Sequence, residues 1–426
     1  MEKDIFGAER QEGTLNPETS ETGGTKEPIA KIQETTSGNL KVLLDRRELK
    51  ITKIHSTAEV DPSAQIDPSV VVPEGCVIGP NVVIAKGAVL GRNVHIGANA
   101  KIGEGAEIWS GSNIGNNVQI GEGAEIWSGS NIGNNVQIGE GARILYDVQI
   151  GEGASIYYGV QIGEGVEIGE GAKISSGSNI GKNVKICDET NIGKNANIRE
   201  GANIGKNTKI WDGANIGKNA KICNEANIGK NAKIGNNADI YYEVQIGEGV
   251  EIGNNVEICN KANIGKNAKI GNNAEIGLDA EIGNNVKIGD NVRIGRRAGI
   301  GEGAKIGKGA SIGNNAKIGN NAEIGDNVKI GRGASIGEGA KIGEGAEISP
   351  YSVIDGKGNL IGYLQQEERV NEEQEERVNE EQEERVDEEQ EEIENEKQEE
   401  RVDEKQEERV NEEKKSFWKR LFGKND

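Results

Sequence analysis

The chain has 426 residues, of which 63 are Gly and only 3% are aromatic, so its composition excludes an ordinary globular core. No stretch approaches the ~20 apolar residues of a transmembrane helix, and the acidic start Met1–Asp4 is unlike a signal peptide, so we expect a cytoplasmic protein. The formal charge of −21 disfavours nucleic-acid partners, and residues 366–413 alone carry −18 of it.

Residues 1–50 are predicted to form a leader with a terminal cap. Glu, Thr, Gly, Ser and Pro dominate residues 1–37, a composition typical of disorder. The apolar residues of the segment 40–51 suffice for one short strand or helix, which would cover the open end of the repeats that follow.

Residues 51–362 are predicted to form a repeat domain, in which every sixth residue from Ile54 to Ile354 is Ile, Val or Leu. On an α-helix a step of six residues turns by ~240°, so these residues would form no apolar stripe. On extended backbone the large residue and the small residue four positions later, such as Ile102 and Ala106, share one face. Between them stand Gly, a polar residue and then Gly or Asn, and we expect Gly and Asn to supply the positive φ of a corner. Each hexad is therefore a short strand and a turn.

A duplication shows how many hexads close one coil. Residues 102–119 recur without change as residues 120–137, and this unit of eighteen residues contains three hexads. The pattern predicts an all-β fold, a single long parallel β-helix with triangular coils in which each strand pairs with the one eighteen residues on. The 51 sixth positions from Ile54 to Ile354 make 17 coils. At ~4.8 Å per coil the rod would be ~80 Å long.

The start of the repeats resembles a known enzyme family. The runs Ile54–Ala64 and Cys76–Ile84 look like the beginning of the hexapeptide-repeat acyltransferases, and are most similar to the O- and N-acyltransferases that act on UDP-glucosamine derivatives in lipid A synthesis. The resemblance covers roughly residues 51–360. It implies a left-handed helix, which the periodicity by itself does not predict.

The resemblance also implies catalysis by a histidine acting as a general base in a cleft between the subunits of a trimer. His55 lies in the first repeat, where the family also has a histidine that is not catalytic. His95 is then the only candidate base. A general base needs an orienting partner and a pocket shielded from water, and unbroken hexads offer neither within one chain. We therefore predict no catalytic residue within a single chain, and keep His95 as the candidate for an intersubunit site.

The sequence predicts no cofactor and no metal site. Its many Gly-rich repeats imitate phosphate-binding loops but do not open helices. Cys187, Cys223 and Cys259 are spaced by 36 residues, or two coils. The resulting ~9.6 Å exceeds both the ~7 Å Cα limit of a disulfide and the reach of one metal ion. We expect these cysteines, and Cys76 at an inward position, to be free thiols.

Outward positions of the rod carry amides and a few aromatic residues. Gln119 and Gln137 fall in one column, and we interpret such columns as structural amide ladders. Trp109 and Trp127 also share a column, with Tyr146 beside them. Two interpretations stay open for these aromatics: a stacking surface for a sugar or a nucleotide base, or an exposed ladder that protects the corner. Because the exposed aromatics are scattered over three corners, we favour the second.

Residues 363–413 form an acidic spacer built from octads such as Gln-Glu-Glu-Arg-Val-Asn-Glu-Glu. One apolar residue per octad makes no coiled-coil seam, so no partner helix is specified. Charge pairs three and four residues apart favour an isolated helix, whereas the net charge favours disorder. Either state makes a spacer.

The terminal segment, residues 414–426, is basic and amphipathic. It resembles, over about ten residues, the short membrane anchors of bacterial actin-like division and shape proteins. We predict contact with an anionic membrane surface, or else with a protein groove. The contact residues would be Phe417, Trp418, Lys419, Arg420, Leu421, Phe422 and Lys424.

These features lead to two hypotheses of function. The first is a non-catalytic scaffolding rod in the cytoplasm, peripheral on the inner face of the membrane, held there or on a partner by its terminal segment. The second is an acyltransferase similar to the lipid A enzymes, which acts between the subunits of a homotrimer.

Overall fold

The computed structural model describes residues 40–41 and 53–364. The predicted leader, most of the predicted cap, the acidic spacer from residue 365 onward and the terminal segment 414–426 therefore lie outside the described residues. Among the described residues there is no helix of any kind, hence none long and apolar enough to span a membrane.

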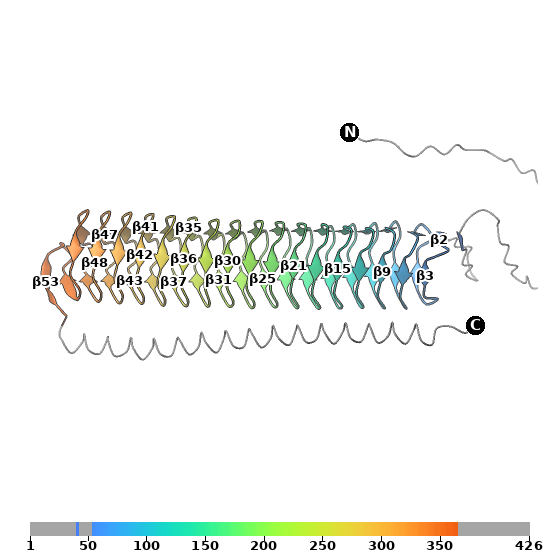
Figure 1. The fold of residues 1–426 in the computed structure, drawn as a ribbon, viewed down its shortest axis with the longest axis horizontal. Helices are drawn as coiled ribbons and strands as arrows, with labels where there is room; N and C mark the ends of the chain where they lie inside the picture. The colour runs from blue at the N-terminus through green and yellow to red at the C-terminus, as the bar shows by residue number, and fades with distance from the viewer. Residues whose placement is uncertain (1–39, 42–52, 365–426) are drawn as a thin grey trace, which may run out of the picture. The chain divides into compact units, whose positions relative to one another are not determined.

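Residues 53–354 form a parallel β-solenoid of about 17 turns (Figure 1). The first strand is β2 (Lys53–His55). From β3 (Glu59–Val60) to β51 (Glu347–Ile348) a two-residue strand begins at every sixth residue, and β52 spans Ser352–Ile354. The spacing never varies between β3 and β51, so no loop interrupts this part of the chain. The period, the all-β class and the number of coils predicted from the sequence are confirmed. The left-handed winding stays a prediction.

From β6 (Val77–Ile78) to β49 (Ser335–Ile336) each strand pairs in parallel with the third strand along, so the coil has three faces. For example, β10 (Lys101–Ile102) pairs with β13 (Gln119–Ile120), with Lys101 opposite Gln119 and Ile102 opposite Ile120. The eighteen-residue register holds from β2 to β52. It places every side chain of a hexad in a column with its equivalents in the coils before and after.

The core is a stack of two apolar positions per hexad. Ile102 at a strand end is 2% exposed and the small residue Ala106 is fully buried, and the same holds along almost the whole rod. At a few small positions a hydroxyl enters the core. Thr190 and Thr208 are buried there, and their Oγ1 atoms donate hydrogen bonds to the carbonyls of Gly205 and Cys223 at 2.9 and 3.0 Å. These buried polar groups are therefore satisfied.

The two turn positions of a hexad are small for different reasons, and only one of them has the positive φ expected of the corner. Gly105, at the third position, has φ +62°, and Asn takes the same position in many coils with φ near +55°. Gly103, at the first position, has an ordinary φ. A Cβ on Gly103 would lie only 2.6 Å from the carbonyl carbon of Gly121 and 2.7 Å from the nitrogen of Glu122. Close approach of the next coil, not backbone conformation, selects glycine there.

Amide ladders run along the corners. In several columns the Nδ2 of a turn asparagine donates to the Oδ1 of the next one, at 3.2 Å from Asn81 to Asn99 and at 3.1 Å from Asn99 to Asn117. Amide pairs also occur on the flat faces, between Asn197 and Asn215 at 3.5 Å and between Asn227 and Gln245 at 3.2 Å. The sequence analysis placed the ladders on the faces only. The repeated Asn-Asn pair of the turns was the signal for the corner ladder.

Both ends of the solenoid carry an antiparallel strand. At the start β1 (Leu40–Lys41) pairs with β2, so this part of the predicted cap is a strand. At the other end β53 (Leu360–Tyr363) folds back on β52. The intervening turn is held by the carboxylate of Asp355, which accepts hydrogen bonds from the backbone N–H groups of Lys357 and Asn359 at 2.9 and 2.8 Å. The sequence analysis did not predict this closing hairpin.

Candidate functional site

His95, the candidate general base, lies on β9 (His95–Ile96) with its side chain exposed. Its neighbours across the sheet are Val77 and Asn113. Its ring makes no hydrogen bond to any residue within 53–364. Nothing on this face of the described chain orients the imidazole, as general base catalysis requires.

His55, the second histidine, lies at the first coil. Its Nδ1 is 2.9 Å from the hydroxyl oxygen of Thr57. The same hydroxyl oxygen accepts a hydrogen bond from the backbone N–H of Gly75 at 3.1 Å. These contacts link the first coil to the second, so His55 has a structural role.

The predicted aromatic column is a contiguous cluster. The ring centroids of Trp109 and Trp127 are 6.3 Å apart, and Tyr146 meets Trp127 edge-on at 4.8 Å. The Nε1–H of Trp127 donates to Glu125, which also accepts a hydrogen bond from Arg143 at 3.0 Å. The guanidinium of Arg143 lowers the pKa of the Glu125 carboxyl. Of the three aromatic side chains, Trp127 is thus held in place by the Glu125–Arg143 pair.

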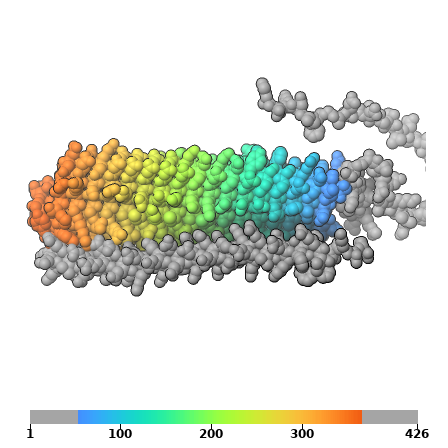
Figure 2. Space-filling model, viewed as in Figure 1, coloured from blue at the N-terminus to red at the C-terminus, as the bar shows by residue number. Residues whose placement is uncertain are grey.

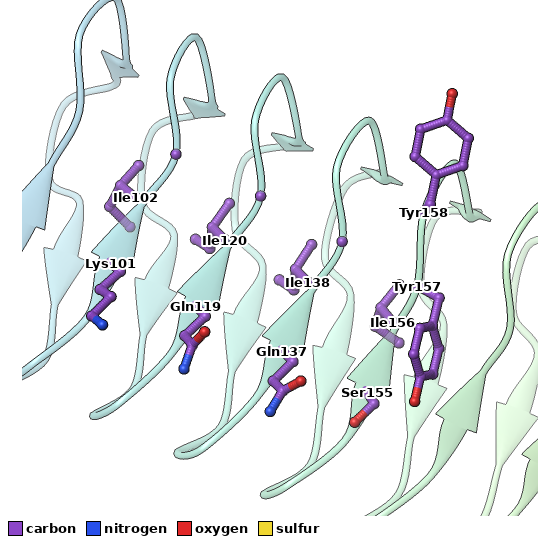
Figure 3. A pocket seen from close by; sticks show the side chains of 13 residues that line it. Lys101, Ile102, Gln119, Ile120, Gln137, Ile138, Ser155, Ile156, Tyr157 and Tyr158 are labelled. Atoms are coloured by element: carbon purple, nitrogen blue, oxygen red, sulfur yellow. The ribbon is translucent and has the colours of Figure 1, made fainter.

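A second aromatic feature is a groove on the neighbouring face, which we call the Tyr157 groove (Figure 3). Its volume is about 320 Å³. The floor is a row of glycines, each at the first turn position of its hexad. One rim is formed by the outward residues of four strands that are neighbours in the sheet, and two tyrosines close one end. The lining residues are Gly103, Gly121 and Gly139 on the floor, Lys101, Gln119, Gln137 and Ser155 on the rim, and Tyr157 and Tyr158 at the end, with the edges of Ile102, Ile120, Ile138 and Ile156 between floor and rim.

The repeat itself builds this groove. The rim belongs to β10, β13, β16 (Gln137–Ile138) and β19 (Ser155–Ile156), which pair in register. Tyr157 occupies the first-turn position that is glycine in the three preceding coils, so its side chain stands where the floor would continue. From the sequence alone, Tyr157 counts only among the aromatics that are scattered over the corners. The signal in the sequence was a large residue directly after a run of three glycines in one column.

Other grooves on the rod are lined by charged columns. One of about 730 Å³ is bordered by Lys287, Lys305, Glu323 and Lys341. The Glu323 carboxylate accepts hydrogen bonds from the Nζ of Lys305 at 2.8 Å and pairs with that of Lys341 at 3.0 Å. These two lysines lower the pKa of Glu323 to about 2. Glu323 is thus paired with one lysine on either side along the rod axis.

None of the four cysteines, all of which lie within the described residues, forms a disulfide, as predicted. Cys76 is buried and its Sγ lies 3.2 Å from the carbonyl oxygen of Gly91. Burial raises the pKa of Cys76 and that of Cys259, which keeps both as thiols rather than reactive thiolates. Among the described side chains no three His, Cys, Asp or Glu residues are placed to share a metal ion.

With this geometry in place, comparison with known proteins defines the class. The chain is a hexapeptide-repeat β-solenoid, and the family described as bacterial transferase hexapeptide (six repeats) matches it over residues 69–103, 99–133, 129–164, 147–182, 225–260, 261–296, 285–320 and 321–356. These matches cover more than half of the sequence. The chain belongs to the bacterial transferase hexapeptide family.

Solved structures similar to this chain include sugar-nucleotide acyltransferases. The UDP-N-acetylglucosamine O-acyltransferase of Moraxella catarrhalis is 20% identical over 47% of this chain and 70% of that one, with a TM-score of 0.24. The Arabidopsis UDP-N-acetylglucosamine acyltransferase is 17% identical over 54% and 70%, with a TM-score of 0.23. A GDP-perosamine N-acetyltransferase of Caulobacter crescentus is 22% identical over 33% and 52%, with a TM-score of 0.16. Scores this low assign neither an activity nor a substrate. No curated protein sequence matches the chain.

Proposed function

We propose that this protein is a non-catalytic scaffolding rod, held at the cytoplasmic face of a membrane or on a partner by residues 414–426. The observation that carries the proposal is the unvarying hexad spacing from β3 to β51. On the visible face the coloured residues make an even surface without projecting loops (Figure 2). Function on a β-solenoid usually resides in loops that depart from the repeat.

The interactions along the rod favour stiffness. Consecutive coils are joined on three faces by backbone hydrogen bonds, as from Gly103 N–H to the carbonyl of Ile120 at 2.9 Å. Turn amides add further bonds, as from the N–H of Ala98 to the Oδ1 of Asn116 at 2.8 Å. Because these bonds repeat in almost every coil, bending would strain many of them together. A stiff spacer of set length is what such a chain provides.

The tether is proposed from the sequence of the terminal segment. Phe417, Trp418 and Leu421 supply apolar area, and Lys419 and Arg420 supply charge, for an anionic lipid surface. We expect the full chain to co-sediment with vesicles that contain anionic lipid and to leave neutral vesicles unbound. A chain that ends at Glu413 should lose this binding. Equal sedimentation of the two chains would refute the tether.

An acyltransferase is the second candidate, and membership of a transferase family favours it. In a homotrimer His95 would face a neighbouring subunit. The test is transfer from an acyl thioester to UDP-N-acetylglucosamine, the sugar nucleotide named for similar structures. Activity that His95→Ala abolishes and His55→Ala keeps would overturn the scaffold proposal. A monomeric mass in solution would remove the intersubunit cleft that this candidate needs.

A further inference from the structure

We propose that the Tyr157 groove binds an extended, uncharged carbohydrate chain that lies along the rod axis. This inference goes beyond the scaffold proposal, since it assigns a ligand class to one face of the rod. It rests on the shape of the groove, the free hydrogen-bonding capacity of its rim and the charge beside its floor.

The groove has the shape of a channel with one end wall. Its floor of Gly103, Gly121 and Gly139 has no side chains, so a flat ring can lie against the backbone. The floor ends at Tyr157, whose ring is 47% exposed, with Tyr158 above it at 62% (Figure 3). A volume of about 320 Å³ is at the small end of ligand-binding clefts and suits a short stretch of sugar rings.

The rim offers hydrogen-bonding groups that the protein itself leaves unused. Gln119 and Gln137 are exposed, and their side-chain amides make no hydrogen bond to any described residue. This contrasts with the corner asparagines, which bond to each other. A carboxamide presents two donors and one acceptor oxygen and so matches the vicinal hydroxyls of a sugar.

The spacing of these amides is set by the β-sheet. Gln119 and Gln137 are directly opposite each other on β13 and β16, so they stand ~4.8 Å apart along the axis. This repeat is close to the advance of one ring in an extended β-linked glycan. Each ring would therefore lie beside one amide. Alternate rings of a β-1,4-linked chain are turned over, so successive amides would meet the two edges of the ring in turn, and the last ring would stack its C–H face on Tyr157.

Charge decides between neutral and anionic ligands. The residues that follow the floor glycines are Glu104, Glu122 and Glu140, which form an exposed acidic column beside the channel. Lys101 is the one cation among the lining residues. An anionic chain, whether a nucleic acid or a uronic acid polymer, would lie next to three like charges. An uncharged glycan meets no such repulsion.

The test is calorimetric titration of the full chain with cellohexaose, a neutral β-linked oligosaccharide. We expect saturable binding, about tenfold weakening by Tyr157→Ala, and a comparable loss in the double variant Gln119→Ala/Gln137→Ala. Two matched substitutions should leave the affinity unchanged. Trp211→Ala removes an aromatic from the same column three coils further on, and Gln149→Ala removes an exposed amide from another face.

Three results would overturn the assignment. They are no heat of binding at millimolar cellohexaose, unchanged affinity in Tyr157→Ala, or equally tight binding of an oligogalacturonate of the same length. Thermal unfolding of each variant, recorded in parallel, separates loss of the groove from loss of the fold. The acyl-transfer and vesicle experiments have independent readouts, so their failure leaves this result intact.

Discussion

At the scale of single residues, stability depends on which side chain occupies the third turn position of each hexad. That position has positive φ in almost every coil, and Gly or Asn fills it in most. Lys261, with φ +58°, and Glu225, with φ +60°, are among the exceptions. A side chain with a Cβ costs roughly 1–2 kcal/mol in this conformation. These positions are local weaknesses in an otherwise consistent repeat.

We therefore predict that Lys261→Gly stabilises the rod by about 0.5–1 kcal/mol, because relief of the left-handed strain exceeds the added entropy of the unfolded chain. The measurement is the midpoint of denaturant unfolding. Lys266→Gly is the matched control, since Lys266 lies in the neighbouring turn of the same coil with an ordinary φ. It should be neutral or destabilising. Stabilisation by both substitutions, or by neither, would contradict the explanation.

At the scale of one face, columns of charged side chains couple successive strands. The column that contains Glu251 reads Lys233, Glu251, Lys269, and both lysine Nζ atoms reach the carboxylate, at 2.9 and 2.8 Å. Further along, β38 (Lys269–Ile270), β41 (Lys287–Ile288) and β44 (Lys305–Ile306) place three lysines side by side. Opposite charges across strands stabilise and like charges destabilise, each by a few tenths of a kcal/mol.

Lys287→Glu should therefore raise the stability by about 0.5–1 kcal/mol, because it turns two like-charge neighbours into two opposite-charge pairs. The gain should shrink in high salt, since these side chains are exposed to solvent. Lys317→Glu is the control, because its neighbours across the sheet are Gly299 and Ser335. An equal gain in the control would show that net charge, rather than the column, is responsible.

Acid should weaken the same columns in a defined range of pH. The lysines beside Glu323 lower its pKa in the folded rod to about 2, whereas a free Glu titrates near 4.3. A lowered folded pKa contributes stability that is complete above about pH 4.3 and is lost as the pH falls through about 2. The wild type should thus exceed Glu323→Gln in unfolding midpoint at pH 6, and the difference should vanish toward pH 2. A difference that grew with acidity would refute this assignment.

The sequence predicts some features of the fold and the groove but not others. The alternation of Ile102 and Ala106, the corners and the eighteen-residue register could be predicted, because each is decided within one hexad and then repeated. The antiparallel strand β53 and the Tyr157 groove could not. Both depend on a local departure from the repeat, a fold-back after Asp355 or a large side chain at the end of a run of glycines, and a periodicity averages such departures away.

At the scale of the whole molecule, the rod is quasi-one-dimensional. Each coil contacts only the coils before and after it, so its stability is a sum of coil and interface contributions. The duplicated units, residues 102–119 and 120–137, offer a clean test of this additivity. Without the second copy, the first would pack on residues 138–155 through the same side chains that the second uses. The one interface lost is that between the two copies.

We predict that deletion of residues 120–137 leaves a folded rod of 16 coils, ~4.8 Å shorter and with a modestly lower unfolding midpoint.

Deletion of residues 120–128 is the matched control. Nine residues are one and a half hexads, so the chain after the junction would bring Gly129 to the position of a core isoleucine and Ile132 to a turn. This variant should lose the hexad register at the junction and unfold at a much lower denaturant concentration. Circular dichroism gives the fold and small-angle scattering the length. Similar stability of the two deletions would mean that the coils are not independent units set by the hexad register, and the additive description of the rod would fail.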